Sequence, residues 1–326
     1  MTLRMDARIE TWELTKCFRI ASGEITKTDL VVVTLEDDGV VGRGEGSPFF
    51  VYNQTAAGEL ATIESVREAV ERGVSREELG SLLPPGPARN AIDCALWDIE
   101  AKRAGTIWSL LDLPAPDYLD ALMTIGLDEP AAMARDAERL SDFPELKIKL
   151  NADRIMERMS AIRAAAPRAK LVIDANEGWT GGLLREVAPA LADLGVEMIE
   201  QPVPRGHDET LAGFQSPIKL CVDESLHTCA DLDRVQAYYD VINIKLDKTG
   251  GLTEALKLAE LGQNRGLELM VGNMMGTSLS MAPSYVIGSL CAYRDLDGPA
   301  HYVADRDNGM PFEHGRSHLF TPALWG

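Results

Sequence analysis

The stretch from residue 122 to residue 295 decides the fold, beginning with Leu122-Met-Thr-Ile-Gly126 and continuing with Leu146-Lys-Ile-Lys-Leu150. Short apolar runs recur along it, and each is followed by a segment with the spacing of an amphipathic helix. The eight runs are 122–126, 146–150, 171–174, 197–200, 218–223, 241–245, 267–271 and 290–295. Such alternation favours parallel strands with right-handed crossovers. It predicts an α/β fold, a compact (β/α)-barrel of the TIM type. A doubly wound open sheet is the alternative fold, but it would not require all eight units.

The first 116 residues follow a different pattern. Residues 8–50 are typical of antiparallel strands, with a β-prone run at Leu30–Leu35 and a hairpin turn at Asp38-Gly39. Helical spacing takes over in residues 55–111, most clearly at 88–104 after the breaker Pro84-Pro-Gly-Pro87. We therefore expect a smaller α+β domain at 1–116 and a barrel of the (β/α)7β type at 117–302.

Composition narrows the possible partners and the compartment. The 326 residues carry 51 acidic and 32 basic side chains, a formal net charge of −19. Such an acidic surface repels phosphate backbones and anionic lipids, which argues against nucleic-acid and membrane roles. The five cysteines are scattered without a Cys-x-x-Cys pair, and no apolar leader or bilayer-length segment is visible. We expect a cytoplasmic protein with reduced thiols.

Charged residues stand at the ends of five consecutive predicted strands. They are Lys149, Asp174, Glu200, Asp223 and Lys245, each one strand–helix unit from the next. A barrel places its chemistry where the strands end, so these five side chains should point into one mouth. The alternative is that they merely begin loops, which would be the better interpretation of any one of them alone.

The three acids at the centre of this series suggest a metal site. Asp174, Glu200 and Asp223 lie on adjacent strands, and three converging carboxylates cannot all stay ionised without a cation. Oxygen ligands without His or Cys suit a hard ion, so the expected cofactor is Mg²⁺. Asn176 is a candidate for indirect contact with that ion.

The two flanking lysines suggest the reaction. Lys149 and Lys245 would face each other across the metal, and Lys147 lies on the same strand face as Lys149. A neighbouring ammonium and a divalent cation should lower the pKa of a lysine, as a lysine base requires. A substrate carboxylate on Mg²⁺ becomes acidic at its α-carbon. One lysine on each face would then invert that carbon through an enediolate.

The motifs around these residues resemble the muconate-lactonizing subgroup of the enolase superfamily. The motifs are Leu146–Leu150, Val172-Ile-Asp-Ala-Asn176, Ile199-Glu-Gln-Pro202, Val222-Asp-Glu-Ser225, Asn243-Ile-Lys-Leu-Asp247 and the helix Ala91–Asp98. The resemblance implies Asp174, Glu200 and Asp223 as metal ligands and Lys149 and Lys245 as acid/base residues. It also implies that the N-terminal domain caps the barrel mouth and that the tail 303–326 returns to it.

The last predicted strand bears on the substrate. Arg294-Asp-Leu-Asp-Gly298 places Asp295 and Asp297 on one strand face, and carboxylates suit a cation. Resemblance to the subgroup's dipeptide epimerases implies that this pair holds a substrate α-ammonium, with Thr124 as a hydrogen-bonding candidate. The alternatives on the same scaffold are an N-acyl amino acid racemase, an o-succinylbenzoate synthase and a muconate-type cycloisomerase. A non-catalytic ligand-binding barrel is the alternative from another class.

The N-terminal loops depart from the subgroup's Ala-Glu epimerases. Their specificity arginine would fall near Ser22, and Glu24 adds the opposite charge. The second loop is apolar and aromatic, and its Phe49 and Tyr52 join Glu24 as candidate substrate contacts. We therefore expect a dipeptide substrate, L-Ala-D/L-Glu or another L-Ala-Xaa, and leave the second residue open. A homo-oligomer is possible.

Overall fold

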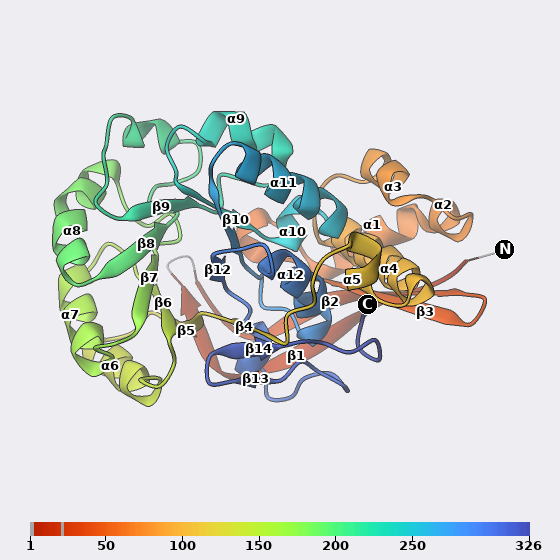
Figure 1. Cartoon of the computed structure of the whole chain (residues 1–326), viewed down its shortest axis with the longest axis horizontal. Coiled ribbons are helices and arrows are strands. Elements are labelled where there is room, and N and C mark those ends of the chain that lie inside the picture. Colours follow the sequence, from red (N-terminus) through yellow and green to blue (C-terminus); the bar gives the residue numbers. More distant parts are fainter. Residues whose placement is uncertain (1–2, 21–22) are drawn as a thin grey trace.

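The computed structural model describes residues 3–20 and 23–326 and divides into an N-terminal α+β part and a curled parallel sheet (Figure 1). Three antiparallel strands form the N-terminal sheet in the order β1-β2-β3. The predicted turn is confirmed, because Asp37 pairs with Val40 across Asp38 and Gly39, which both have positive φ. The elements are β1 Arg4–Ile20, β2 Gly23–Asp37, β3 Val40–Gly46, the 3₁₀ turn η1 Phe50–Tyr52, α1 Ala56–Ser65, α2 Arg67–Glu71, α3 Arg76–Leu82, α4 Pro87–Ala104 and α5 Ile107–Leu111.

Helix α4 forms where the sequence predicted it, because Pro87 takes its first position and Gly105 ends it. The helix is buried along most of its length and packs on β3. The approach is close: a Cβ at Gly44 would lie 2.1 Å from the carbonyl oxygen of Ala91. Glycine in β3 is therefore what lets the sheet and the helix meet.

Eight parallel strands form one curled sheet in the order β12-β11-β10-β9-β8-β7-β6-β5. Each of the eight predicted runs overlaps a strand. The consecutive strand order excludes the doubly wound alternative, which needs a reversal of strand order. One hydrogen bond from the Leu122 N–H to the Arg294 carbonyl, 2.8 Å long, joins the two ends. The strands are β5 Met123–Ile125, β6 Glu145–Lys149, β7 Lys170–Asp174, β8 Val196–Glu200, β9 Lys219–Val222, β10 Val241–Ile244, β11 Glu268–Val271 and β12 Tyr293–Arg294.

Helices cover the outer face of this sheet, with α6, α7 and α8 along the left side of Figure 1. The connecting elements are α6 Pro130–Arg139, α7 Ile155–Ala165, α8 Gly181–Asp193, η2 Asp208–Leu211, η3 Cys229–Asp231, α9 Leu232–Val235, α10 Leu246–Thr249, α11 Leu252–Asn264, α12 Ser278–Gly288 and η4 Gly298–His301. The predicted (β/α)-barrel architecture is thereby confirmed. None of the helices in the described part of the chain combines the length and apolar character needed to span a membrane.

The inner face of the sheet has two layers. Its lower layer is a buried apolar cluster made of Leu122, Val172, Met198, Cys221, Val241, Met270 and Tyr293. Because side chains alternate along a strand, the residue two positions after Val172 is Asp174, after Met198 is Glu200, and after Cys221 is Asp223. The acids therefore form the upper layer, at the carboxyl ends of the strands.

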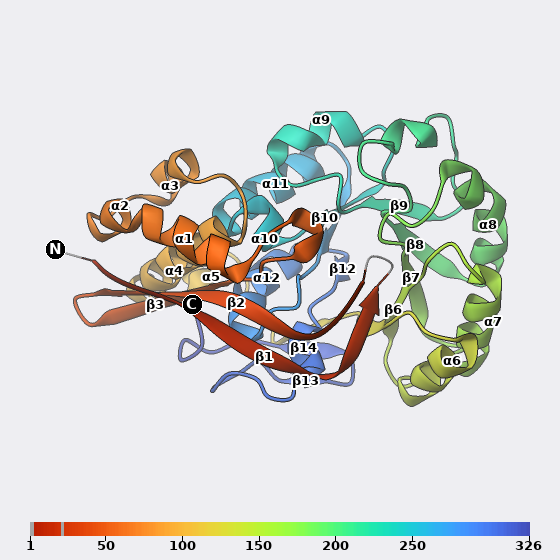
Figure 2. The same ribbon diagram turned by 180° about the vertical axis from the view of Figure 1, so that it is seen from behind.

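The C-terminal residues lie against the N-terminal part. A small sheet, β13 Phe312–Glu313, β14 Arg316–His318 and β4 Tyr118–Asp120, comes first. Trp325 Nε1 then donates to the Cys94 carbonyl at 3.0 Å, and the Gly326 N–H donates to Asp98 at 2.7 Å, both on α4. Figure 2 shows the β1–β2 hairpin crossing from α4 to the barrel strands, where Lys16 pairs with Asp136 of α6 at 3.2 Å.

Candidate active site

A cavity of about 690 Å³ opens at the carboxyl ends of the strands, between the barrel and the N-terminal part. It brings together nine residues singled out from the sequence: Phe49, Tyr52, Thr124, Lys149, Asn176, Asp223, Lys245, Asp295 and Asp297. The other lining residues are Ile25, Phe50, Val51, Glu224, Asn273, Met274 and Met275. Lys147, Asp174 and Glu200 are buried beneath this wall.

Lys147 lies at the centre of the upper layer, among the acids. Its Nζ lies 2.7 Å from Asp295, 2.8 Å from Glu200 and 3.1 Å from Asp174. Burial alone would lower the pKa of Lys147, but these three carboxylates raise it well above its usual value. Lys147 is therefore a fixed ammonium that holds acids from three strands together.

Each proton-transfer candidate is paired with one acid. Lys149 Nζ lies 2.6 Å from Asp174 Oδ2, and Lys245 Nζ lies 2.6 Å from Asp223 Oδ2. Strand β6, which carries Lys149, is four positions from β10, which precedes Lys245. The two ammonium groups therefore reach one cavity from opposite parts of the curled sheet.

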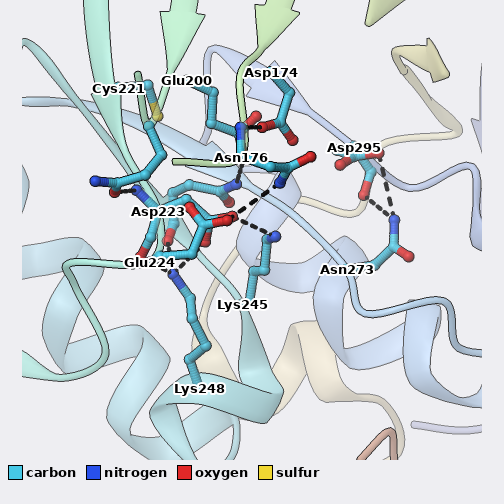
Figure 3. Close-up of polar contacts among 12 residues, drawn as sticks. Asp174, Asn176, Glu200, Cys221, Asp223, Glu224, Lys245, Lys248, Asn273 and Asp295 are labelled. Atoms are coloured by element: carbon cyan, nitrogen blue, oxygen red, sulfur yellow. Dashed lines mark hydrogen bonds and ion pairs between the residues drawn. The ribbon is translucent and has the colours of Figure 1, made fainter. Parts of the chain in front are cut away.

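A third lysine contacts Asp223 from the other side (Figure 3). Lys248 Nζ donates to Asp223 Oδ1 at 2.5 Å, to the Asp223 carbonyl at 2.6 Å and to the Asn243 carbonyl at 3.2 Å. Burial opposes ionisation, but Lys245 and Lys248 hold the pKa of Asp223 well below its usual range. Asp223 is thus an anion with both oxygens occupied.

Without a metal ion, the neighbouring acids decide the direction of the Lys245 pKa. Burial lowers the pKa of this lysine, but the facing Asp223 and Glu200 outweigh burial and raise it above its usual value. The sequence interpretation attributed the expected lowering to a divalent cation together with Lys147 as the second ammonium. In the fold, Lys147 still lowers the pKa of Lys245, but Asp223 and Glu200 outweigh it.

The remaining acids show how strongly the site favours a cation. Burial, together with the charge on Asp174, raises the pKa of Glu200 to about 7. Burial and Asp223 raise that of Glu224 to about 8. Burial opposes the effect at Asp174, where Lys149 and Lys147 lower the pKa to about 2. The predicted crowding of carboxylates is therefore present, and positive charge is what relieves it.

The donor chemistry fits Mg²⁺. Asp174, Glu200 and Asp223 offer only oxygen, and Glu224 Oε2 and Asn176 Oδ1 are buried beside them without a hydrogen bond from the described residues. Among residues 3–20 and 23–326, however, no three acidic, His or Cys side chains surround one point as ligands, since ammonium groups hold the carboxylates. Asn176, named from the sequence, donates its N–H to Asp174 at 3.0 Å and its Nδ2 to Glu224 at 3.2 Å.

Asp295 and Asp297 also line the cavity, and Asp295 shares the Lys147 ammonium with Glu200 and Asp174. Asp297 Oδ2 accepts from the Thr124 N–H at 2.7 Å and lies 3.0 Å from His301 Nε2. Burial opposes the effect, but His301 and Thr124 lower the pKa of Asp297 below its usual range. Asn273 Nδ2 donates to the Asp295 carbonyl at 2.8 Å.

The N-terminal part supplies the apolar wall. The rings of Phe49 and Phe50 are tilted by 52° with their centroids 4.8 Å apart, and Tyr52 meets the ring of His227 edge-on. Glu24 is exposed, is not among the cavity-lining residues and lies 3.5 Å from Cys17 Sγ. Ser22, where the sequence placed the specificity position, lies outside the described residues.

Sequence reasoning missed four residues of this site. Asn243, whose Nδ2 donates to Glu200 at 2.7 Å, could have been found, because it lies two residues before Lys245 on the same strand face. Glu224 follows a predicted ligand directly. Lys248 and His301 carried no signal, since both lie on short helical turns after the strands.

Comparisons with known proteins place the chain in a family. Residues 4–113 match the profile of the mandelate racemase/muconate lactonizing enzyme N-terminal domain, and residues 131–323 match the enolase C-terminal domain-like profile. The L-Ala-D/L-Glu epimerase of Escherichia coli K12 is 41% identical over 95% of this chain and 98% of its own length. The N-acetyl-D-glutamate racemase of a Pseudoalteromonas species is 39% identical over 91% and 95%.

Solved structures agree. One is an enolase family member from Agrobacterium tumefaciens with homology to dipeptide epimerases, with sodium and L-Ala-L-Glu bound. It superimposes with a TM-score of 0.96 at 41% identity and covers 99% of this chain and all of that one. The dipeptide epimerase of Enterococcus faecalis V583, complexed with Mg and L-Leu-L-Tyr, gives 0.91 at 31% identity, covering 98% and 97%. The chain therefore belongs to the mandelate racemase/muconate lactonizing enzyme family of the enolase superfamily, as its motifs predicted.

Proposed function

We propose that this protein is an isomerase, a dipeptide epimerase that inverts the α-carbon of the C-terminal residue of an L-Ala-Xaa dipeptide. The observation that carries the proposal is the pair Lys149 and Lys245, which reach one cavity from opposite parts of the sheet beside Asp295 and Asp297. The named activities of the relatives, epimerases and a racemase, support it.

The lysines move the proton. One lysine, in its neutral form, removes the α-proton from one face of the substrate, and the other, as an ammonium, delivers a proton to the opposite face. Reversal of the roles accounts for turnover of the other stereoisomer, and Lys147 keeps the acids between them in place.

Asp174, Glu200 and Asp223 would hold Mg²⁺. When bound, the ion stabilises the negative charge that develops on the substrate carboxylate as the α-proton leaves. The neighbouring Enterococcus structure, which contains Mg and a dipeptide, supports this assignment.

Asp295 and Asp297 would bind the α-ammonium of the first residue, because both carboxylates line the cavity and neither is a proposed metal ligand. Thr124 holds Asp297 in position through its N–H. Phe49 and Tyr52 would contact the second residue, whereas Glu24, the other candidate from this part of the sequence, lies outside the cavity lining. We propose residues 1–116 as the cap, 117–302 as the barrel and 303–326 as a returning segment, in a cytoplasmic protein whose Cys94, Cys221 and Cys291 are buried thiols.

Two observations bear on the second residue of the dipeptide, and they favour different side chains. The Escherichia coli relative is named for Ala-Glu, and the Agrobacterium structure has L-Ala-L-Glu bound, which favours glutamate. In contrast, Ile25, Phe50 and Met274 in the cavity wall favour an apolar side chain. An N-acyl amino acid racemase is the second candidate function, supported by the Pseudoalteromonas relative.

One assay separates these functions. L-Ala-L-Glu, L-Ala-L-Leu, L-Ala-L-Lys and N-acetyl-L-glutamate are incubated with the protein and Mg²⁺ in D₂O, and NMR follows the α-proton. Dipeptide epimerisation predicts exchange with inversion for at least one dipeptide at a higher kcat/KM than for the N-acetyl compound. The reverse order would favour the racemase, and no exchange with any substrate would contradict both.

A further inference from the structure

The segment that follows Lys245 is pressed against helix α4 of the N-terminal part. Arg89 donates to the carbonyls of Thr249 and Gly250, the latter at 3.0 Å from Nε. Asp93 Oδ2 accepts from the Thr253 N–H at 3.0 Å. A Cβ on Gly251 would lie 2.3 Å from Asp93 Oδ2, so the contact leaves no space for a side chain there. This seam fixes residues 246–253 to α4.

Asp247 is the buried acid at the centre of the seam, and its Oδ1 accepts two hydrogen bonds. The Ser47 N–H donates at 2.9 Å and Asn90 Nδ2 donates at 2.8 Å. Asn90 also donates to the Glu45 carbonyl at 3.2 Å, and Ser47 Oγ donates to the Met274 carbonyl at 2.6 Å. One oxygen thus joins the end of β3, helix α4 and, through Ser47, the loop after β11.

These partners lead directly to the cavity wall. Ser47 begins the segment whose Phe49, Phe50 and Tyr52 line the cavity, and Met274 lines it from the barrel side. Asp247 does not line the cavity itself, but it lies two residues after Lys245 on α10. The position of the apolar wall relative to Lys245 is therefore set through Asp247.

We infer that Asp247 is a positioning residue that holds the substrate-contacting segment 47–53 in register with Lys245, and thereby sets the affinity for the dipeptide's second side chain. The inference rests on the proposed dipeptide activity. Lys248, the next residue, donates to Asp223 instead. Asp247 therefore contacts the N-terminal part, and Lys248 contacts the acid cluster.

The test compares two substitutions at one position. Asp247→Ala removes the acceptor, whereas Asp247→Asn keeps an oxygen that can accept from both Ser47 and Asn90. Loss of two buried hydrogen bonds should raise KM for the dipeptide by roughly tenfold or more in Asp247→Ala. The same variant should keep kcat within about threefold and the Mg²⁺ dissociation constant, measured by calorimetry, within about twofold, because the acid cluster is untouched. Asp247→Asn should restore KM to within about threefold of the wild type.

Thr253→Val provides the matched control, because Thr253 contacts Asp93 in the same seam but is not linked to the cavity wall. Its KM should stay near that of the wild type, so a general weakening of the seam is distinguished from a displaced wall. If Asp247→Ala does not fold, Asn90→Ala, which removes one of the two donors, should raise KM several-fold.

An unchanged KM in Asp247→Ala or Asn90→Ala, an equal loss of Mg²⁺ affinity, or an equal rise of KM in Thr253→Val would overturn the inference. The wild-type rate in the same assay tests the proposed function on its own. If the wild type does not turn over any dipeptide, the proposed function is contradicted. If the wild type is active and Asp247→Ala has the same KM, only the role of Asp247 is contradicted.

Discussion

Lys149 and Lys245 stand four strands apart in an eight-stranded curled sheet, and both line the same cavity. Their side chains are only 11% and 7% exposed, and each is 2.6 Å from a different carboxylate. Two amines so placed can act on opposite faces of one carbon. This relationship, more than any single residue, is what inversion of a stereocentre requires.

Asp297→Asn should weaken turnover of dipeptides much more than turnover of N-acetylated amino acids. A free α-ammonium loses a charged acceptor, which is worth roughly 1.5–3 kcal/mol and corresponds to about a 10- to 100-fold lower kcat/KM. An N-acetyl group carries no positive charge to lose. Steady-state polarimetry on both substrate types measures the ratio, and equal losses would contradict ammonium recognition by Asp297.

Removal of divalent metal should stop α-proton exchange. The ion's stabilisation of developing charge is worth several kcal/mol, so chelation by EDTA should lower the exchange rate by at least about 100-fold. Added Mg²⁺ should restore the rate in the wild type, whereas Glu200→Gln should need a much higher Mg²⁺ concentration. Exchange that persists in EDTA-treated, metal-free protein would contradict the metal assignment.

The stability of the fold should depend on the ionisation of Asp247. Burial raises the pKa of this carboxyl to about 7, against the opposing hydrogen bonds from Ser47 and Asn90. Its pKa in an unfolded chain is about 3.9, so the folded state binds the proton more tightly. The resulting stabilisation is complete below about pH 4 and is lost as the pH rises through about 7.

Asp247→Asn does not titrate and should gain stability relative to the wild type between pH 4 and pH 8, by up to about 4 kcal/mol. Urea unfolding midpoints of the two proteins at pH 5 and pH 8 measure the difference. A constant difference across this range would mean that the carboxyl ionises normally in the folded protein.

The sequence predicted the strand ends well for a physical reason. The alternation of side chains along a strand and the length of each strand–helix unit are local properties of the sequence. Together they place the five charged side chains on one inward face at one end of the sheet, namely Lys149, Asp174, Glu200, Asp223 and Lys245. The predicted turn at Asp38-Gly39 and helix at 88–104 are local in the same sense, and both are confirmed.

The contacts between the two parts of the chain could not be predicted. Asp247 meets Ser47, 200 positions away along the chain, and His301 reaches Asp297 from a short turn after the last strand. The direction of the Lys245 pKa also required the fold, because it depends on which carboxylates lie nearest. Such distances arise from packing and leave no periodic signal in the sequence.

The most direct test of the central claim is face-selective exchange in the single lysine variants. Lys149→Ala and Lys245→Ala are each incubated with both stereoisomers of a dipeptide substrate in D₂O, and NMR follows the α-proton and the stereochemistry. Loss of a general acid or base should slow inversion by roughly 10²- to 10⁴-fold in both variants. We predict that any exchange left in Lys149→Ala is confined to one stereoisomer, and in Lys245→Ala to the other. Inversion at the wild-type rate in either variant would contradict the two-lysine mechanism.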